Sequence, residues 1–198
     1  MARDQIGDHL KIRKLTMLSP TRRLTLIRHA KSSWKYPHLH DRERQLNKRG
    51  KRDAAMMGKR LRDRGVQPDL IISSPAKRAL ETVRSIAREI RYSKDRIVVD
   101  DMIYEEGAYG VLNLIKGLEG TYKEIMLVGH NPTFSELAAS LGNESIGNMP
   151  TCSVFCIEFR ADTWAKIASV ESHLVFYDYP KSGSTVRSET LPKTRREQ

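Results

Sequence analysis

The sequence has no apolar run that approaches the roughly 20 residues of a membrane-spanning helix. Its first twenty residues also lack the apolar stretch of a secretory signal peptide. Hydrophobic residues make up 39% of the 198 residues and charged residues 30%, a balance typical of a globular protein. These absences predict a cytoplasmic protein that does not bind a membrane.

Cysteine is nearly absent, with Cys152 and Cys156 as its two occurrences. In a regular strand, residues four apart are separated by about 13 Å, which exceeds the ~7 Å limit for the Cα atoms of a disulfide. A phosphatase loop of the Cys-x5-Arg type would need arginine at position 158 or 162, where the chain has Glu158 and Asp162. We therefore expect two half-buried core residues without a catalytic role.

Two other groups of phosphate- and metal-binding motifs are missing. Segment 129–132 (GHNP) lacks the Gly-Lys-Ser/Thr ending of a P-loop, and no Asp-x-Asp phosphatase motif occurs. His38 and His40 have the spacing of a ligand pair, but no further ligand cluster accompanies them, so we expect them in a loop. The sequence predicts neither a metal nor a cofactor.

Positive charge is what the chain has in excess, with a net charge of +11. Residues 41–64 contain ten basic and four acidic residues and so contribute +6 of this charge. A basic face can steer an anionic ligand, nucleic acid included. For the residues far from any strand end, we favour a solvated helix face that serves solubility.

Short apolar runs alternate with helical segments through the middle of the chain. Strands are predicted at 23–28, 70–73, 97–99, 124–128, 152–159 and 173–179, and helices at 47–64, 76–90, 111–118 and 133–141. Asn47 is expected to cap the first helix, Ser74 and Pro75 to start the second, and Thr133 with Glu136 to form a capping box. The pattern predicts an α/β protein, with three α/β/α layers and a mainly parallel central sheet.

One domain is predicted, at residues 22–180. Residues 1–21 are expected to be an N-terminal extension, and residues 181–198 a C-terminal tail poor in large apolar side chains. Met17 offers an alternative start, six residues before the first predicted strand.

Three predicted strands end in turns that carry reactive side chains. Arg28 and His29 end the first strand, the run SPAKR with Arg78 follows the second, and His130 follows the fourth. Because ligands of parallel sheets bind beyond the carboxyl ends of the strands, these ends should meet in one cleft. The residues expected there are Arg28, His29, Lys31, Arg78 and His130, with Asp41, Glu105 and Glu106 nearby.

This combination of side chains suits phosphoryl transfer. Arginines are planar, permanently charged donors for phosphate oxygens. One imidazole can attack phosphorus and carry the phosphoryl group, while a second, protonated imidazole stabilises the charge on the equatorial oxygens. The arginines then supply the charge that a magnesium ion would otherwise supply. Trp34 and Tyr36, in the loop that follows His29, are expected to plug this loop onto the sheet.

Five segments carry a resemblance to the histidine phosphatase superfamily, and specifically to its SixA-type phosphohistidine phosphatase branch. They are residues 26–34 (LIRHAKSSW), 41–50 (DRERQLNKRG), 68–83 (PDLIISSPAKRALETV), 103–107 (IYEEG) and 127–138 (LVGHNPTFSELA). In the first, Ala30 stands where many relatives have glycine. Together the segments cover about residues 22–180, in the order of the family.

The resemblance implies a phosphoglycerate-mutase-like fold and assigns roles to four residues. His29 would be the nucleophile that forms a phosphohistidine intermediate, which water then hydrolyses. Arg28, Arg78 and His130 would complete the phosphate pocket, with His130 stabilising the transition state.

The other site residues have less defined roles. Larger relatives use a glutamate as general acid in the stretch that holds Glu105 and Glu106, but the SixA branch is not known to depend on one. Glu105 is the candidate acid, although we expect both glutamates to shape the cleft instead. Lys31, Ser32 and Asp41 are candidate substrate contacts.

The function that we predict is a metal-independent phosphatase whose target is phosphohistidine on a protein. The target would be a phosphotransfer domain of a signal-transduction or sugar-transport relay, with inorganic phosphate as the product. The short chain leaves little room for the insertions that cover small substrates in larger relatives. Two alternatives stay open: a general phosphomonoesterase acting on a small metabolite or nucleotide, and a non-catalytic module that binds a phosphoprotein or nucleic acid. The positioned nucleophile argues against the binding module, and a nucleic acid partner is not expected.

Overall fold

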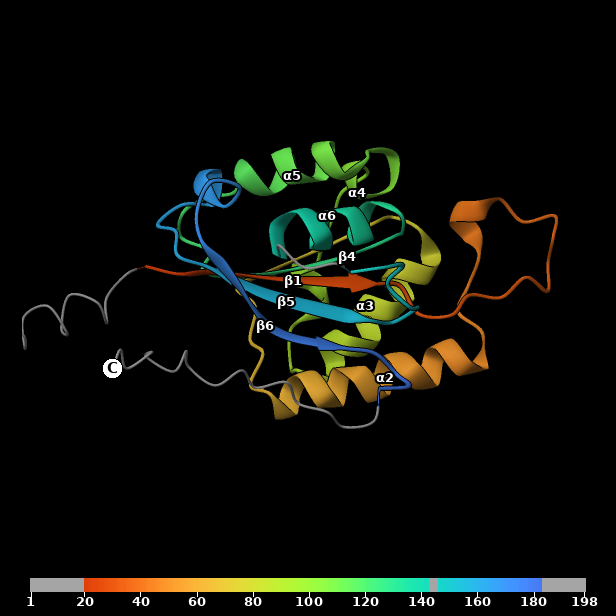
Figure 1. Ribbon diagram of the computed structural model, residues 1–198. Helices are drawn as coiled ribbons and strands as arrows, with labels where there is room; N and C mark the ends of the chain where they lie inside the picture. The colour runs from red at the N-terminus through yellow and green to blue at the C-terminus, as the bar shows by residue number, and fades with distance from the viewer. Residues whose placement is uncertain (1–19, 143–145, 183–198) are drawn as a thin grey trace, which may run out of the picture.

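The computed structural model of the protein describes residues 20–142 and 146–182, in which a six-stranded sheet lies between two layers of helices (Figure 1). The strands are β1 (Arg22–Arg28), β2 (Leu70–Ser73), β3 (Val98–Val99), β4 (Glu124–Gly129), β5 (Val154–Phe159) and β6 (Ser172–Asp178). The α-helices are α2 (Lys48–Asp63), α3 (Lys77–Glu89), α4 (Met102–Glu105), α5 (Ala108–Lys116) and α6 (Thr133–Gly142). Three short 3-10 helices are η1 (Asp41–Glu43), η2 (Lys94–Arg96) and η3 (Trp164–Lys166).

The sheet has the strand order β3-β2-β4-β1-β5-β6. Strands β1 to β4 pair in parallel, whereas β5 runs antiparallel to both β1 and β6. The predicted α/β class with a mainly parallel central sheet is therefore confirmed. Most of the predicted N-terminal extension and C-terminal tail lies outside the described residues, so the predicted domain boundaries stay predictions.

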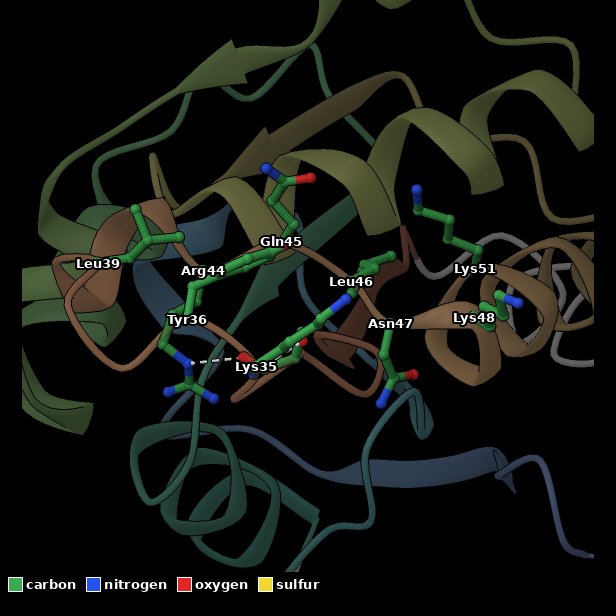
Figure 2. A pocket seen from close by; sticks show the side chains of 10 residues that line it. Lys35, Tyr36, Leu39, Arg44, Gln45, Leu46, Asn47, Lys48 and Lys51 are labelled. Carbon is green, nitrogen blue, oxygen red and sulfur yellow. Dashed lines mark hydrogen bonds between the residues drawn. The ribbon is translucent and has the colours of Figure 1, made fainter.

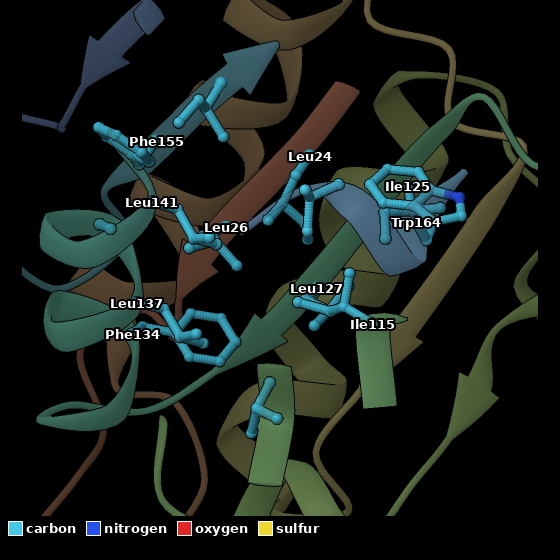
Figure 3. Close-up of a cluster of buried hydrophobic side chains, with 14 of the residues drawn as sticks. Leu24, Leu26, Ile115, Ile125, Leu127, Phe134, Leu137, Leu141, Phe155 and Trp164 are labelled. Carbon is cyan, nitrogen blue, oxygen red and sulfur yellow. The ribbon is translucent and has the colours of Figure 1, made fainter. Parts of the chain in front are cut away.

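Alternating side chains along each strand feed two separate cores, one on each face of the sheet. In β4, Ile125 and Leu127 face the core under α5 and α6, and Met126 and Val128 face the core over α2 and α3. The other strands follow the same alternation, because successive strand residues point to opposite faces. Figure 3 shows the first of these cores, in which the aromatic rings of Phe134, Phe155 and Trp164 pack with leucines and isoleucines.

The start of α2 follows the prediction. The side chain of Asn47 accepts a hydrogen bond of 2.8 Å from the backbone N–H of Gly50, as a helix cap does. The backbone of Lys31 crosses this first turn so closely that a Cβ atom on Gly50 would lie 2.1 Å from the Lys31 carbonyl oxygen. Glycine at position 50 therefore allows the loop after β1 to pack closely against α2.

Several predicted boundaries are wrong in detail. Helix α3 begins at Lys77 with Ala76 at its N-cap, so Ser74 does not cap it, and α5 begins three residues before the predicted position. Helix α6 begins at Thr133 itself, which is therefore not the capping residue before the helix. The four-residue helix α4 was not predicted at all.

The cysteines also differ from expectation in part. Both are fully buried free thiols, and Cys152 lies in a turn with a positive φ of 64° before β5 begins at Val154.

None of the helices in residues 20–142 and 146–182 is long and apolar enough to cross a membrane. The cytoplasmic location stays a prediction.

A buried carboxylate joins the end of the sheet to α2. Asp178 lies at the end of β6 and is 4% exposed. Its carboxylate forms ion pairs with Arg60 at 2.9 Å and with Arg64 at 2.8 Å. Removing one partner of a buried ion pair leaves the other charges without compensation.

We expect Asp178→Ala to lower the free energy of unfolding by about 3 kcal/mol, because Arg60 and Arg64 lose their shared partner. In thermal unfolding this corresponds to a decrease in Tm of roughly 6–12 °C for a domain of this size. The matched control is Asp63→Ala, which breaks the exposed pair with Arg62 and should change stability by less than about 0.5 kcal/mol. Equal small effects for both variants would contradict the role assigned to Asp178.

Candidate active site

Three neighbouring strands deliver their carboxyl ends to one place, as the sequence predicts. Strands β2, β4 and β1 are adjacent in the sheet, so Ser74, His130 and His29 follow strand ends that lie side by side. Backbone hydrogen bonds link these ends: the N–H of Ser74 donates to Val128, and the N–H of His29 donates to Gly129. The rings of His29 and His130 lie with their centroids 5.0 Å apart.

The guanidinium of Arg78 connects the groups of this site. Arg78 lies in the first turn of α3 and is 6% exposed. Its Nε donates to Nε2 of His29 at 3.2 Å, and one Nη contacts Nδ1 of His130 at 3.3 Å. The same guanidinium donates to the backbone carbonyl of Asp41 at 2.6 Å and to its carboxylate at 2.8 Å. A single buried cation therefore holds both imidazoles and one carboxylate.

His29 has the tautomer of a nucleophile. Its Nδ1 lies 2.8 Å from the carbonyl oxygen of Ala30, which only accepts, so the proton is on Nδ1 and the lone pair is on Nε2. Burial lowers the pKa of His29; the Ala30 contact opposes this, and the charges of Arg78 and Arg28 lower the pKa further, to about 4. His29 is therefore neutral at pH 7. Its Nε2 becomes available for attack once a bound anion replaces it as the acceptor of the hydrogen bond from Nε of Arg78.

His130 is oriented in the opposite way. Because Arg78 can only donate, Nδ1 of His130 accepts from it, and Nε2–H donates to the hydroxyl of Ser74 at 2.7 Å. Ser74 also accepts from the backbone N–H of Ala76. Burial, followed by the charges of His29 and Arg78, lowers the pKa of His130 to about 3.

Asp41 forms the outer wall of the site together with Arg44 and Tyr104. Its carboxylate accepts hydrogen bonds of 2.8 Å from Arg44, from Arg78 and from the hydroxyl of Tyr104. Burial alone would raise the pKa of Asp41, but the hydrogen bonds from these three side chains outweigh it and lower the pKa to about 2. The ring of Tyr104 also meets the ring of His130 edge-on, with centroids 5.4 Å apart.

The second arginine expected in the phosphate pocket lies to one side. The guanidinium of Arg28 donates to the carbonyl of Met149 and to the side chain of Asn148, not to the groups around Arg78. Its charge nevertheless contributes to the lowered pKa values of both histidines, so Arg28 lies within electrostatic reach of the cluster.

The remaining predicted residues divide into two groups. Ser32 is buried and accepts a hydrogen bond of 2.6 Å from Arg44, while the side chain of Lys31 is exposed beside the loop. Glu105 is 60% exposed and binds Arg42 at 2.6 Å, and Glu106 is exposed at the end of α4. The structure therefore directs Glu105 to Arg42 and not to either histidine.

Sequence reasoning missed Ser74, Arg44 and Tyr104 as site residues. Ser74 was interpreted as a helix cap, although its position directly after a strand was a usable signal. Arg44 and Tyr104 reach the site through the conformation of a loop and through the unpredicted helix α4. The expectation that Trp34 and Tyr36 plug their loop onto the sheet is also wrong, because Trp34 is 70% exposed and Tyr36 is 50% exposed. The ring of Trp34 stacks with the guanidinium of Arg44, which lies 3.3 Å from the ring centroid.

No group of three or more His, Cys, Asp or Glu side chains in residues 20–142 and 146–182 has the arrangement of a metal site. The anion-binding capacity of the cluster comes from Arg78, with Arg44 and Arg28 nearby. The cluster places two imidazoles beside fixed positive charge.

Known proteins share this fold. A family model of the histidine phosphatase superfamily (branch 1) matches residues 24–110. An uncharacterised chloroplast protein of Arabidopsis thaliana is 30% identical over 158 residues, which span 74% of this chain and 70% of that protein. The structure of a protein provisionally assigned as phosphohistidine phosphatase SixA from Agrobacterium tumefaciens is 29% identical, covers 81% of this chain and 99% of its own, and superposes with a TM-score of 0.69. A mycobacterial glucosyl-3-phosphoglycerate phosphatase, 16% identical with coverage of 78% and 97%, has a TM-score of 0.56 and shares the fold.

The chain belongs to the histidine phosphatase superfamily. Its fold is the phosphoglycerate-mutase-like fold of the SixA structures, and it is a phosphatase of this superfamily.

We expect His29 to titrate near pH 4 in the ligand-free protein, well below the ordinary 6.5 of an imidazole. The imidazole resonances in NMR spectra, assigned by their loss in His29→Gln, measure this directly. Unfolded chains bind a proton near pH 6.5 and the folded chain does not, so the free energy of unfolding should decrease as the pH falls from about 6.5 towards 4. A midpoint near 6.5 for His29 would contradict the effect on its pKa that is assigned to burial and to the neighbouring arginines.

Proposed function

We propose that the protein is a metal-independent phosphatase that removes the phosphoryl group from phosphohistidine on a protein. His29 is the nucleophile, and Arg78, His130 and Arg28 supply the donors and charge that receive the phosphoryl group. The products are the unmodified histidine of the partner and inorganic phosphate. A phosphotransfer domain of a signalling relay is the substrate class that fits this reaction.

The nature of the carboxylate in the site is the observation that supports this substrate. Within the described ranges, the hydrogen bonds of His29, Arg78 and His130 reach one carboxylate, that of Asp41. With a pKa of about 2, Asp41 is ionised at neutral pH and has no proton to give to a leaving group. The site therefore suits a leaving group that departs without a carboxylic acid.

The imidazole of a phosphohistidine is such a leaving group. Nε2 of His29 attacks phosphorus, the N–P bond of the substrate breaks, and the substrate imidazole leaves in neutral form because its other nitrogen carries a proton. Water then attacks phosphorus on His29 and releases inorganic phosphate. An alkoxide leaving group would need a proton during the first step, and Asp41 cannot supply it.

The lowered pKa of His29 fits the same sequence of steps. His29 enters the reaction as the neutral base that nucleophilic attack requires. A phosphoryl group brought against Arg78 adds negative charge beside His130 and so favours the protonated form of that imidazole. His130 then stabilises the charge on the transferring oxygens.

The direct test is release of phosphate from a phosphohistidine-bearing protein in excess EDTA. We expect turnover by the wild-type protein, a loss of at least about a thousandfold in His29→Ala, and no change in His173→Ala. His173 is a suitable control because it lies on β6, next to Glu158, at the opposite end of the sheet.

Three results would contradict the proposal. Equal activity of wild type and His29→Ala would remove His29 as the nucleophile. Turnover of small phosphate esters alone would favour the general phosphomonoesterase. A folded protein that releases phosphate from neither kind of substrate would favour a binding module.

Glu105→Gln separates the phosphohistidine phosphatase from the phosphomonoesterase. We expect phosphohistidine turnover to stay within about twofold of the wild type, because Glu105 is exposed and paired with Arg42. A general acid contributes roughly 10²- to 10⁴-fold, so a loss of this size would show that Glu105 protonates the leaving group.

A further inference from the structure

A second basic feature lies next to the histidine cluster and shares Arg44 with it. It is a hollow of about 300 Å³ formed by the loop after β1 and the first turn of α2. Its lining residues are Ser33, Lys35, Tyr36, Leu39, Arg44, Gln45, Leu46, Asn47, Lys48 and Lys51, called here the loop pocket. Figure 2 shows Lys48 and Lys51 on one side of it and Arg44 on the other.

The loop pocket carries positive charge without a carboxylate. Four of its lining residues are basic and none is acidic. Arg44 is committed to Asp41 and Ser32, but Lys35, Lys48 and Lys51 form no ion pair with any residue of the ranges 20–142 and 146–182. Three lysines without an ion-pair partner thus line the loop pocket, and the carboxylate next to it, that of Glu81, accepts a hydrogen bond from the backbone N–H of Leu46.

The pocket also has apolar surface. Leu46 lies buried at its base, Leu39 is half-buried, and Tyr36 is 50% exposed. The exposed ring of Trp34 lies on the same loop. Aromatic side chains are enriched in surfaces that bind other proteins.

The position of the pocket relates it to the substrate of the phosphatase. Arg44 lines the pocket and also binds the carboxylate of Asp41, which in turn binds Arg78. A protein whose phosphohistidine reaches His29 would therefore bring its neighbouring residues over the loop. In Figure 1 the red-orange segment after β1 projects beyond the layers of the fold, where a partner has access to it.

We propose that the loop pocket docks an acidic segment of the phosphorylated protein substrate, with glutamates or aspartates on Lys35, Lys48 and Lys51 and an apolar side chain over Leu46. This proposal rests on the proposed function, because it names the partner surface of the same reaction. Lysines are flexible point charges, which suit carboxylates in no fixed geometry, whereas a dedicated phosphate site would use the planar fork of arginine. The reacting phosphoryl group does not occupy this pocket, since none of His29, Arg78 or His130 lines it.

The binding test uses a fluorescein-labelled peptide of glutamates and leucines, and the same peptide with lysine in place of glutamate. Fluorescence anisotropy at low salt should show binding of the acidic peptide, weakened roughly tenfold in Lys48→Glu/Lys51→Glu. Glutamate is favourable in the first turn of a helix, so this variant should fold. The control Lys59→Glu/Lys116→Glu makes the same change of net charge at exposed positions outside the pocket and should bind like the wild type.

Other binding results would overturn the proposal. Equal weakening by both double variants would mean that net charge alone attracts the peptide. No preference for the acidic over the basic peptide would exclude an acidic partner. Tighter binding of a single-stranded oligonucleotide, lost in the same variant, would assign the pocket to nucleic acid.

Kinetics separate this proposal from the function on which it rests. With phosphohistidine placed in the acidic peptide, Lys48→Glu/Lys51→Glu should raise KM roughly tenfold at unchanged kcat, and leave turnover of free phosphohistidine unchanged. Turnover of both compounds with equal KM in all variants would overturn docking and leave the function intact. Specific binding of the acidic peptide without turnover of either compound would overturn the proposed function and leave docking intact.

Discussion

The placement of one guanidinium organises the site. Arg78 is held inside the protein by the first turn of α3, and it contacts His29, His130 and Asp41 at the same time. Because arginine only donates, its contacts determine which nitrogen of His130 carries the proton. Burial is the main reason that the pKa of His29 is low, and the permanent charge of Arg78 lowers it further. The tautomer of His130 and the anion-binding capacity of the site therefore depend on where α3 begins.

The fold supplies that position through the order of its strands. β2, β4 and β1 are neighbours, so three turns from distant parts of the sequence meet at one edge of the sheet. The two cores anchor these strands on both faces, and Gly50 allows the loop after β1 to cross α2 closely enough to bring Asp41 and Arg44 to the same edge. Burial on both faces also explains why imidazoles at these strand ends have lowered pKa values.

Much of the fold and of the candidate site could be predicted from the sequence, and the residues that were missed have identifiable physical reasons. His29 and His130 directly follow apolar strands, and Arg78 follows the turn after β2. Because ligands of parallel sheets bind beyond the carboxyl ends of the strands, all three could be placed at the site. Periodicity cannot detect a four-residue helix such as α4, which is why Tyr104 was missed. Ser74 was misassigned because serine before proline is a frequent helix start, whereas here its hydroxyl is committed to His130. The contacts of Arg44 depend on a loop conformation that no local pattern encodes.

The central claim is that the phosphoryl group passes through His29. The measurement that tests it most directly is rapid alkaline quenching of the enzyme with a ³²P-labelled phosphohistidine protein, followed by identification of the labelled residue by mass spectrometry. The account predicts transient label on His29 that disappears as inorganic phosphate accumulates. Label on His130 instead, or phosphate release without any labelled enzyme at the earliest times, would contradict it.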